Sequence, residues 1–285
     1  MTPQDYDYLR KLLKQRSGLV LSAEKQYLAE SRLLPVARKH KLNGLGELVR
    51  ELRRAGHSPL SVEVVEAMTT NETFFFRDKA PFENFRDTVL PALMAARARE
   101  KRLRIWCTAA ATGQEPYSLA MILDELGVSL ARWRVDILAT DISGEVLQKA
   151  KSGIYSQFEV QRGLPIAHLV KHFTQVGELW QIAPALRSMV QFRPINLLND
   201  FAPLGTFDIV FCRNVLIYFD QETKTDVLDR LAGQIPSDGY LVLGAAETVV
   251  GLTDAYQPVP GRRGLYAPNV ARGEAGKVLK FAVKR

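Results

Sequence analysis

The sequence is poor in the residues that disulfide-bonded and metal-binding proteins need. It contains two cysteines and four histidines in 285 residues. Cys107 and Cys212 both lie in apolar, strand-like runs, so we expect buried, reduced thiols and a reducing compartment rather than a disulfide framework. His168 and His172 stand one helical turn apart, but no third ligand accompanies them, so we predict no metal site.

Long apolar runs are also missing. The N-terminal stretch MTPQDYDYLR has no apolar signal core, and the most apolar run, FDIVFCRNVLIYF, is interrupted by Asp208, Arg213 and Asn214. Such a run is too short to span a bilayer. We therefore expect a cytoplasmic protein that does not insert into a membrane.

Positive charge is concentrated at the N-terminal end of the chain. Residues 1–60 contain 12 Lys and Arg against 6 Asp and Glu, a net charge of +6, whereas the whole chain has +7. A basic front on a nearly neutral body predicts an acidic partner, which could be nucleic acid, anionic lipid or an acidic protein surface.

Residues 1–77 have the pattern of a small, basic, all-α domain. Thr2-Pro3 opens a helix that Gly18 ends, Ser22 opens a second helix that we expect to be kinked or broken near Pro35, and Ser58-Pro59 opens another. Between them, GLGELVRELRR predicts a helix that ends before Gly56. Residues 78–98 predict one long helix that leads out of this domain.

From residue 99 to about 270, short β-rich runs alternate with helical ones. This rhythm predicts an α/β fold with a doubly wound, mostly parallel, Rossmann-like sheet. Within it, HFTQVGELWQIA predicts a small β-hairpin insertion at about 161–188, with its turn at Gly177-Glu178. Residues 271–285 form a basic C-terminal tail.

The run RIWCTAAATGQEPYSLAMIL predicts a strand, a tight turn and a helix. This geometry brings backbone close to a nucleotide-like ligand. The turn lacks the glycines of a pyrophosphate-binding loop and carries Glu115, which would repel phosphate but suits hydroxyls and a cationic group. A plain strand-to-helix loop is the alternative.

Other polar residues follow later strands. Asp141 ends RVDILATD and could accept both hydroxyls of a ribose, although a helix-capping aspartate would look the same. Asn196 could pair with an adenine edge or could simply belong to a turn. Arg213, Asn214 and Tyr218 follow another buried strand, and ligands of such sheets bind beyond the carboxyl ends of strands.

A nucleoside site without a phosphate-binding loop favours S-adenosylmethionine, whose carboxylate needs polar and cationic partners. The segment TTNETFFFRD offers Asn71, Thr73 and Arg77 for this purpose. We expect its phenylalanines, Phe74, Phe75 and Phe76, to pack the loop and exclude water from the site, with at least one of them in the core.

Together, MTTNETFFFRD, AAATGQEPYSLAMIL, ATDIS, INLL and FDIVFCRNVLIYFD resemble the CheR-type chemotaxis receptor methyltransferases over essentially the whole chain. The resemblance implies a class I S-adenosylmethionine-dependent methyltransferase fold. It also implies methyl transfer to glutamate side chains of chemoreceptors, which forms methyl esters. Arg77 and Tyr218 would lie nearest the reacting methyl group. The implied cofactor site consists of Asn71, Thr73, Arg77, Glu115, Asp141, Asn196, Leu197, Arg213 and Asn214.

The resemblance gives the basic helices a partner, the cytoplasmic signalling domain of a receptor. Arg50, Arg53 and Arg54 fall on one helical face and are our candidates for docking. The hairpin is shorter and poorer in glycine than in family members that dock on a receptor's C-terminal pentapeptide, so we expect pentapeptide-independent docking. We expect a monomer.

Two other functions share some of these features. A nucleic-acid methyltransferase would have the same cofactor and the same basic charge, but RNVLIYF stands where base-amine methylating enzymes carry Asn/Asp-Pro-Pro-aromatic. A non-catalytic adapter that binds S-adenosylmethionine would keep the fold and need no turnover.

Overall fold

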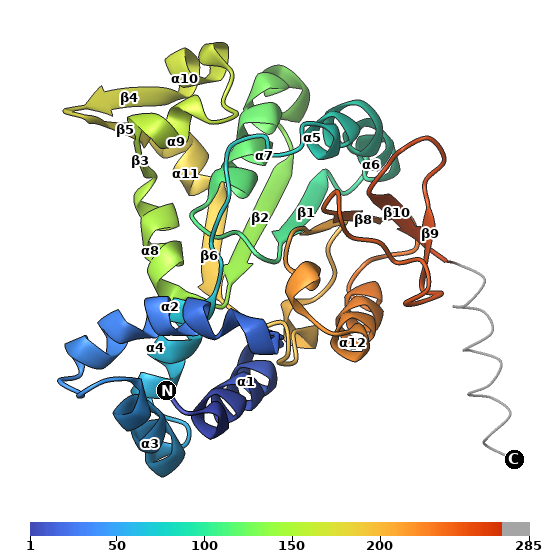
Figure 1. Cartoon of the computed structure of the whole chain (residues 1–285). Helices are drawn as coiled ribbons and strands as arrows, with labels where there is room; N and C mark the ends of the chain where they lie inside the picture. The colour runs from blue at the N-terminus through green and yellow to red at the C-terminus, as the bar shows by residue number, and fades with distance from the viewer. Residues whose placement is uncertain (270–285) are drawn as a thin grey trace, which may run out of the picture.

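The computed structural model describes residues 1–269, so the tail that we expected at 271–285 lies outside the described residues. The N-terminal end folds into a bundle of short helices (Figure 1). Its elements are α1 (Pro3–Ser17), η1 (Ala23–Lys25), α2 (Gln26–Lys39), α3 (Leu45–Ala55) and α4 (Pro59–Met68). The bundle has its own apolar core, in which Leu9, Leu13, Leu33 and Leu48 are fully or almost fully buried.

The helix ends follow the capping residues of the sequence. The Thr2 hydroxyl accepts a hydrogen bond from the Asp5 amide and opens α1, and Gly18 ends it with φ 75°. Ser58 caps α4 in the same way as Thr2 caps α1. We expected this helix to be kinked or broken near Pro35, and it does not break there, because α2 continues through that residue. Its neighbours Val36 and Ala37 are buried in the bundle core, and this packing offsets the hydrogen bond that proline removes.

The single helix that we expected at 78–98 is interrupted. It consists of α5 (Ala80–Asn84), a π-helical turn η2 (Phe85–Val89) and α6 (Leu90–Ala96). In the π turn the Leu90 amide donates to the Phe85 carbonyl, five residues back. Pro91 cannot donate to the ladder, and local π adjustments are a common response to such a gap.

Among residues 1–269, seven strands form the main sheet, in the order β6-β2-β1-β7-β8-β10-β9. The first five are parallel, and β10 pairs antiparallel with β8 and β9. The strands are β1 (Arg102–Cys107), β2 (Arg134–Asp141), β6 (Val190–Pro194), β7 (Ile209–Cys212), β8 (Tyr240–Leu243), β9 (Tyr256–Pro258) and β10 (Leu265–Pro268). This architecture confirms the predicted α/β fold. The sequence pattern missed β9, a three-residue edge strand that contains a proline.

Helices cover both faces of the main sheet (Figure 1). Because side chains alternate along a strand, Ile105 lies in the apolar cluster on one face and Trp106 in the cluster on the other. The helices and short 3₁₀ helices that connect the strands of the main sheet are α7 (Gln114–Glu125), η3 (Gly127–Leu130), α8 (Gly144–Ser152), α11 (Pro184–Ser188), η4 (Ala202–Leu204), η5 (Leu216–Tyr218) and α12 (Gln221–Ala232).

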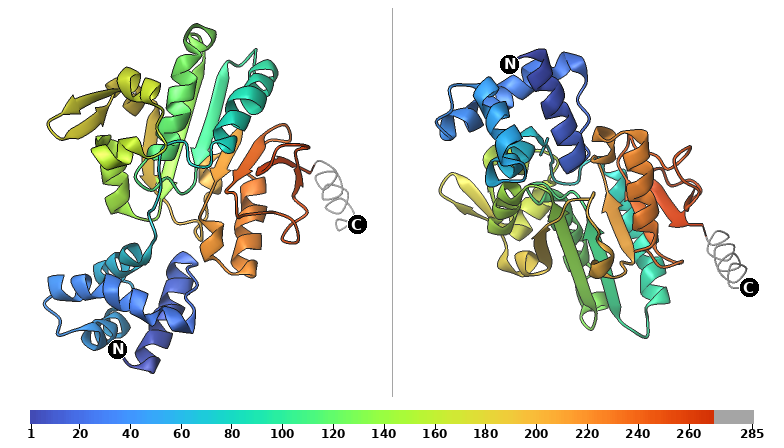
Figure 2. Two further views of the ribbon diagram at one scale, coloured as in Figure 1. Left: turned by 45° about the horizontal axis from the view of Figure 1, so that its top comes forward. Right: turned by 90° about the horizontal axis from the view of Figure 1, so that it is seen from below.

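A small antiparallel sheet lies beside the main one. The expected hairpin is present as β4 (Phe173–Val176) and β5 (Leu179–Ile182), and β3 (Ile154–Ser156), which we did not expect, adds a third strand in the order β3-β5-β4. Two helices, α9 (Gln157–Gln161) and α10 (Ile166–His172), complete this β-subdomain. The helical bundle lies beyond the carboxyl ends of β1 and β2 (Figure 2). The segment that connects α4 of the bundle to α5 therefore passes the carboxyl ends of the strands.

No helix within residues 1–269 is long and apolar enough to cross a membrane. Both cysteines are buried and free, as we predicted.

Candidate active site

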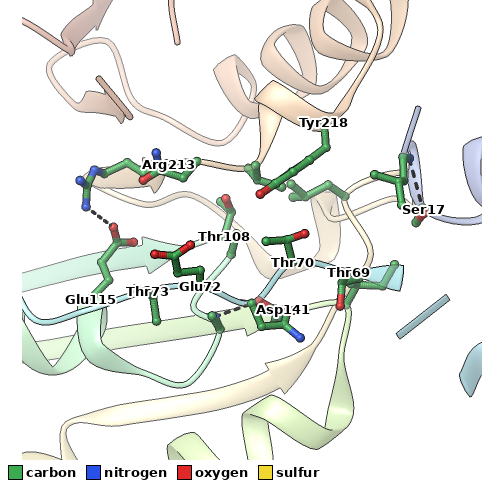
Figure 3. A pocket seen from close by; sticks show the side chains of 18 of the residues that line it. Ser17, Thr69, Thr70, Glu72, Thr73, Thr108, Glu115, Asp141, Arg213 and Tyr218 are labelled. Carbon is green, nitrogen blue, oxygen red and sulfur yellow. Dashed lines mark hydrogen bonds and ion pairs between the residues drawn. The ribbon is translucent and has the colours of Figure 1, made fainter. Parts of the chain in front are cut away.

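One cavity lies between the helical bundle and the carboxyl ends of the strands (Figure 3). Its walls come from the segment after α4, the turn before α7, the ends of β2 and β6, and the loop after β7. All ten residues that the sequence predicted for the cofactor and the reaction line it: Asn71, Thr73, Arg77, Glu115, Asp141, Asn196, Leu197, Arg213, Asn214 and Tyr218. The sheet topology thus brings five separate motifs to one place.

A buried ion pair forms one side of the cavity. Arg213 Nη1 donates to Glu115 Oε2 over 2.6 Å, and the Arg213 side chain is only 2% exposed. Burial raises the pKa of Glu115 above its usual value, and the Arg213 guanidinium opposes that shift. A buried charge pair needs such close partners, because desolvation of either charge alone is costly.

Arg213 also holds the loop that crosses the cavity. Its Nη2 donates to the Arg77 carbonyl over 2.7 Å and to Asp78 Oδ2 over 2.9 Å. The backbone here is strained, with φ 52° at Phe76 and 70° at Asp78. Left-handed backbone at such residues persists only when surrounding contacts hold it. Arg213 is therefore a fixing point for the segment that carries Arg77.

Asp141 lies at the tip of β2 with one oxygen on each of two backbone amides. Its Oδ2 accepts from the Ala111 amide over 2.9 Å and its Oδ1 from the Ser143 amide over 3.0 Å. Burial raises the pKa of Asp141, and the hydrogen bonds from these amides oppose the shift. Each carboxylate oxygen can accept a further hydrogen bond. Asp141 is therefore oriented by the turn and still able to receive hydroxyl donors.

The turn between β1 and α7 needs glycine at one position. Gly113 has φ 93°, and a Cβ there would lie 2.9 Å from the Ala150 Cβ and 3.1 Å from the Tyr155 hydroxyl. The Tyr155 hydroxyl donates to the Thr112 carbonyl over 2.8 Å. The turn is thus packed against the β-subdomain, which fixes the start of α7 and the position of Glu115.

The phenylalanine triplet does not face the cavity, so our expectation that it excludes water there is wrong. Phe75 is fully buried and contacts Tyr155 and Phe173 edge-on, and Phe76 stacks on His168 with centroids 4.9 Å apart. The triplet anchors the loop to the β-subdomain. The neighbouring Arg77 lines the cavity, but its Nη1 donates to the Glu72 carbonyl and its guanidinium lies 5.7 Å from the Phe74 ring.

Asn196 joins the bundle to the sheet. Its Nδ2 donates to the Arg16 carbonyl over 2.6 Å, and its Oδ1 accepts from the Leu198 amide over 3.0 Å. The turn interpretation therefore describes most of its side-chain bonding. Beside it, Ser17 and Leu19 from the end of α1 also line the cavity, and the sequence pattern gave no sign of them.

Tyr218 points into the cavity from the loop after β7 (Figure 3). Its carbonyl accepts from the Val20 amide over 2.9 Å, which is another link to the bundle. The loop begins with Asn214 at φ 57°, a conformation that asparagine tolerates better than most residues.

Glu247 organises the same loop and was missed by sequence reasoning. Its Oε2 accepts from the amides of Asn214 and Gly244 over 2.7 and 2.8 Å. Its Oε1 accepts from the amides of Val215, Leu216 and Ile217 over 3.0, 2.8 and 3.3 Å. A Cβ at Gly244 would lie 2.6 Å from Oε2. The one sequence signal for Glu247 was an acidic residue shortly after a buried strand. Many ordinary surface loops contain such a residue, so the signal does not distinguish Glu247 from them.

The candidate docking residues lie away from the cavity, on α3. Arg50 is exposed. Arg53, by contrast, lies 3.3 Å from Asp5 Oδ1 and 4.8 Å from the Tyr8 ring, and Arg54 pairs with Glu51 at 2.8 Å. Two of the three candidate docking residues are therefore engaged within the bundle.

Within residues 1–269, no cluster of His, Cys, Asp or Glu could hold a metal ion. His168 and His172 stack on each other, with ring centroids 5.6 Å apart.

The side chains that line the cavity suit S-adenosylmethionine. Asp141 can accept hydroxyls, Glu115 is a buried acceptor near the start of α7, and Ile142, Ile195 and Leu197 supply an apolar wall. Apolar walls with a few convergent polar groups are typical of cofactor sites.

Comparison with known proteins identifies the family. Residues 4–69 match the model described as "CheR methyltransferase, all-alpha domain", and residues 71–265 match "CheR methyltransferase, SAM binding domain". Chemotaxis protein methyltransferase 1 of Pseudomonas aeruginosa is 46% identical over 261 residues, which cover 90% of this chain and 94% of that protein. Chemotaxis protein methyltransferase Cher2 of Pseudomonas putida is 42% identical over 259 residues, with coverage of 90% and 94%.

More distant proteins match as well. The chemotaxis protein methyltransferase of Escherichia coli is 38% identical over 245 residues, which cover 84% of this chain and 82% of that protein. Among solved structures, the plantazolicin methyltransferase BpumL in complex with SAH has a TM-score of 0.33 and 11% identity, covering 77% of this chain and 60% of that one. The two family matches and the close relatives show that the chain belongs to the CheR methyltransferase family, the S-adenosylmethionine-dependent methyltransferases that the sequence resembled.

Proposed function

We propose that this protein methylates glutamate side chains on the cytoplasmic signalling domains of chemoreceptors and so forms glutamate methyl esters. The observation that carries the proposal is that Asp141, Glu115 and Tyr218 line one cavity together, beneath a basic helical bundle. The names of the relatives, chemotaxis protein methyltransferases, support the receptor as the substrate. We propose that the reaction takes place in the cytoplasm.

We propose cofactor contacts for each wall of the cavity. Asp141 would accept the ribose hydroxyls, and Leu197 with the Asn196 turn would lie at the adenine. Glu115 would face the amino group of the methionine part, and Arg77 with Asn71 and Thr73 would lie near its carboxylate. Arg213 and Asn214 would act by fixing the loops around the cofactor. The donor chemistry and burial of these side chains support this assignment.

The reaction needs no general base from the protein. A glutamate side chain has an ordinary pKa of about 4.3, so the nucleophile is already ionised at neutral pH. Bound S-adenosylmethionine supplies an electrophilic methyl group on a sulfonium. The protein's task is to align the attacking carboxylate and to exclude water. Tyr218, which points into the cavity, can donate a hydrogen bond to that carboxylate.

The receptor would dock on the bundle, with Arg50 as the least engaged of the three candidate cations on α3. We propose docking as a monomer and without a C-terminal pentapeptide, because the hairpin strands β4 and β5 are only four residues long. Affinity for free receptor C-terminal peptides tests this directly, and tight binding would contradict it. We also propose the domain division 1–77, 78–98, 99–270 and 271–285, with the insertion at about 161–188.

Labelled S-adenosylmethionine and a purified receptor signalling domain test the proposal. The label should transfer to the receptor and leave as methanol under mild base, as a carboxyl methyl ester must. Label that stays on the receptor after base treatment would contradict ester formation. Filter binding with RNA and DNA separates the nucleic-acid alternative, and absence of turnover with bound cofactor would indicate the adapter.

A further inference from the structure

A second cavity, of about 300 Å³, lies over the face of β1, β2 and β6 beside η4. It shares no lining residue with the reaction cavity. Its lining runs from Arg102 and Arg134, where β1 and β2 begin, to Arg193, which pairs with Thr140 near the carboxyl end of β2. The family matches and the proposed function give this second cavity no role.

Four arginines surround the cavity: Arg102, Arg104, Arg134 and Arg193. Asp136 is the acid that lines it, so the lining carries a net charge of +3. The strand register explains the cluster. Arg102 lies beside Arg134 and Arg104 beside Asp136 in the β1–β2 pairing, so these side chains project from the same face.

The deepest of these arginines is held rigidly. Arg104 donates from Nη1 to the Thr206 carbonyl over 2.5 Å and from Nη2 to the Leu204 carbonyl over 3.0 Å, and it stacks over Phe207 at 4.3 Å. Its Nε is buried and has no hydrogen-bond partner among residues 1–269. Burial lowers the pKa of Arg104, and the neighbouring Arg102 lowers it further. A preorganised guanidinium under this repulsion would be stabilised by an anion.

The other arginines are placed at the rim. Arg102 and Arg134 share Asp136, at 2.8 and 3.1 Å, and their side chains are 47% and 71% exposed. Within the described residues 1–269, the hydrogen-bond partner of the Arg193 guanidinium is Gln191 Oε1, at 3.4 Å. Neighbouring like charges repel, and one carboxylate neutralises only part of the cluster. Apolar side chains, Pro203 and Leu204 among them, line the rest of the cavity.

We infer that this basic cavity binds a small phosphorylated molecule, with the phosphate oxygens on the arginines and the organic part against Pro203 and Leu204. Guanidinium groups match phosphate oxygens in bidentate geometry. The cavity volume lies at the small end of ligand pockets, which favours a compact ligand over a polymer.

Isothermal titration of the full chain with pyrophosphate, in phosphate-free buffer of low ionic strength, tests the inference. We expect one binding site, with ATP binding at least as tightly as pyrophosphate. Saturating S-adenosylhomocysteine should leave the pyrophosphate affinity unchanged. Competition between them would place the phosphate in the reaction cavity and overturn the inference, as would the absence of binding.

Variants locate the site. Arg134→Gln and Arg193→Gln should each weaken pyrophosphate binding about tenfold, the order expected for one charge-assisted contact. Both side chains are exposed, so the fold should survive. Arg86→Gln, which removes an exposed arginine paired with Asp87 outside the cavity, should leave the affinity unchanged. Equal affinities in the wild type and in the Arg134→Gln/Arg193→Gln double variant would contradict the assignment. The proposed methyl transfer does not enter these measurements.

Discussion

Single side chains set the chemistry of the reaction cavity, and they divide into those that face it and those that hold its loops. Asp141, Glu115 and Tyr218 lie on the wall. Arg213 also lines the cavity but is bound to Glu115, to Asp78 and to the Arg77 carbonyl, and Glu247 accepts from the backbone amides of the Tyr218 loop. The second group was the harder to predict. An arginine at a strand tip suggests a ligand contact, but its actual partners come from segments far away in sequence.

Tyr218→Phe tests the proposed hydrogen bond to the attacking carboxylate. The variant keeps the ring and loses only the hydroxyl, so S-adenosylhomocysteine affinity should change little. Turnover should fall roughly tenfold or more, because one oriented hydrogen bond in the transition state has this order of effect. Receptor methylation rates and calorimetric affinities measure the two quantities. Unchanged turnover would remove Tyr218 from the reaction.

Glu247→Gln tests a positioning role. An amide cannot replace a carboxylate that accepts from five backbone amides, since its nitrogen would face donors. The loop that carries Tyr218 should shift and turnover should fall roughly tenfold to a hundredfold. The value of kcat should fall more than the S-adenosylhomocysteine affinity. Glu222→Gln, an exposed acid in α12, is the matched control. Equal effects of both changes would refute the role.

The pH dependence of cofactor binding follows from two buried carboxylates. Burial raises the pKa of Glu115 above 4.5 and that of Asp141 above 3.8. The ionised Glu115 would attract the ligand's amino group, and the ionised Asp141 would accept its hydroxyls. The affinity for the ligand should therefore be highest at pH values above both raised pKa values. It should decline as pH falls through them, beginning above pH 4.5. Calorimetric titration with S-adenosylhomocysteine between neutral and acidic pH measures this. A constant affinity down to pH 4.5 would contradict it.

At the scale of elements, the β-subdomain buttresses the loop that closes the cavity. Phe75 packs among Tyr155 and Phe173, and Phe76 stacks on His168 in α10. The loop's strained backbone depends on these contacts. The triplet is therefore a structural anchor whose functional effect is indirect.

Gly163→Ala tests this buttress. Gly163 has φ 83°, and a Cβ there would lie 2.2 Å from the Phe75 carbonyl oxygen. Gly177→Ala is a close control, because Gly177 has φ 61° but nothing within 4 Å of its Cβ position. In both variants the alanine is strained by the left-handed backbone. Only Gly163→Ala should lower the free energy of unfolding by a further amount of about 2 kcal/mol or more, because of the clash, and only this variant should also lose cofactor affinity. Denaturant unfolding measures the difference. Equal losses would show that the contact does not matter.

At the scale of the whole molecule, the cavity exists because the bundle docks on the sheet. The docking contacts include Val20 to the Tyr218 carbonyl, Lys14 to Asp220 at 2.6 Å, and Glu66 to the Gly144 amide at 2.7 Å. Hydrogen bonding by Lys14 lowers the pKa of Asp220 to about 2. The bundle is thus a wall of the site as well as a candidate receptor surface.

Arg50→Glu tests receptor docking better than a change at Arg53, whose pairing with Asp5 would confuse docking with stability. Methylation of an acidic receptor domain should slow several-fold, and the difference from wild type should shrink as salt rises, because exposed charges are screened. Arg262→Glu makes the same charge change in the loop between β9 and β10. Matched rates for both variants would refute docking through α3.

The sequence alone determined the order of most helices and strands, the parallel sheet, and ten of the residues that line the cavity, because capping residues, alternation and strand-end positions are local signals. Tertiary structure decided what those residues touch. It turned the phenylalanines away from the cavity, committed Asn196 to a link with α1, and brought Glu247 to the Tyr218 loop. Such contacts depend on how distant segments pack, and no local pattern encodes that geometry.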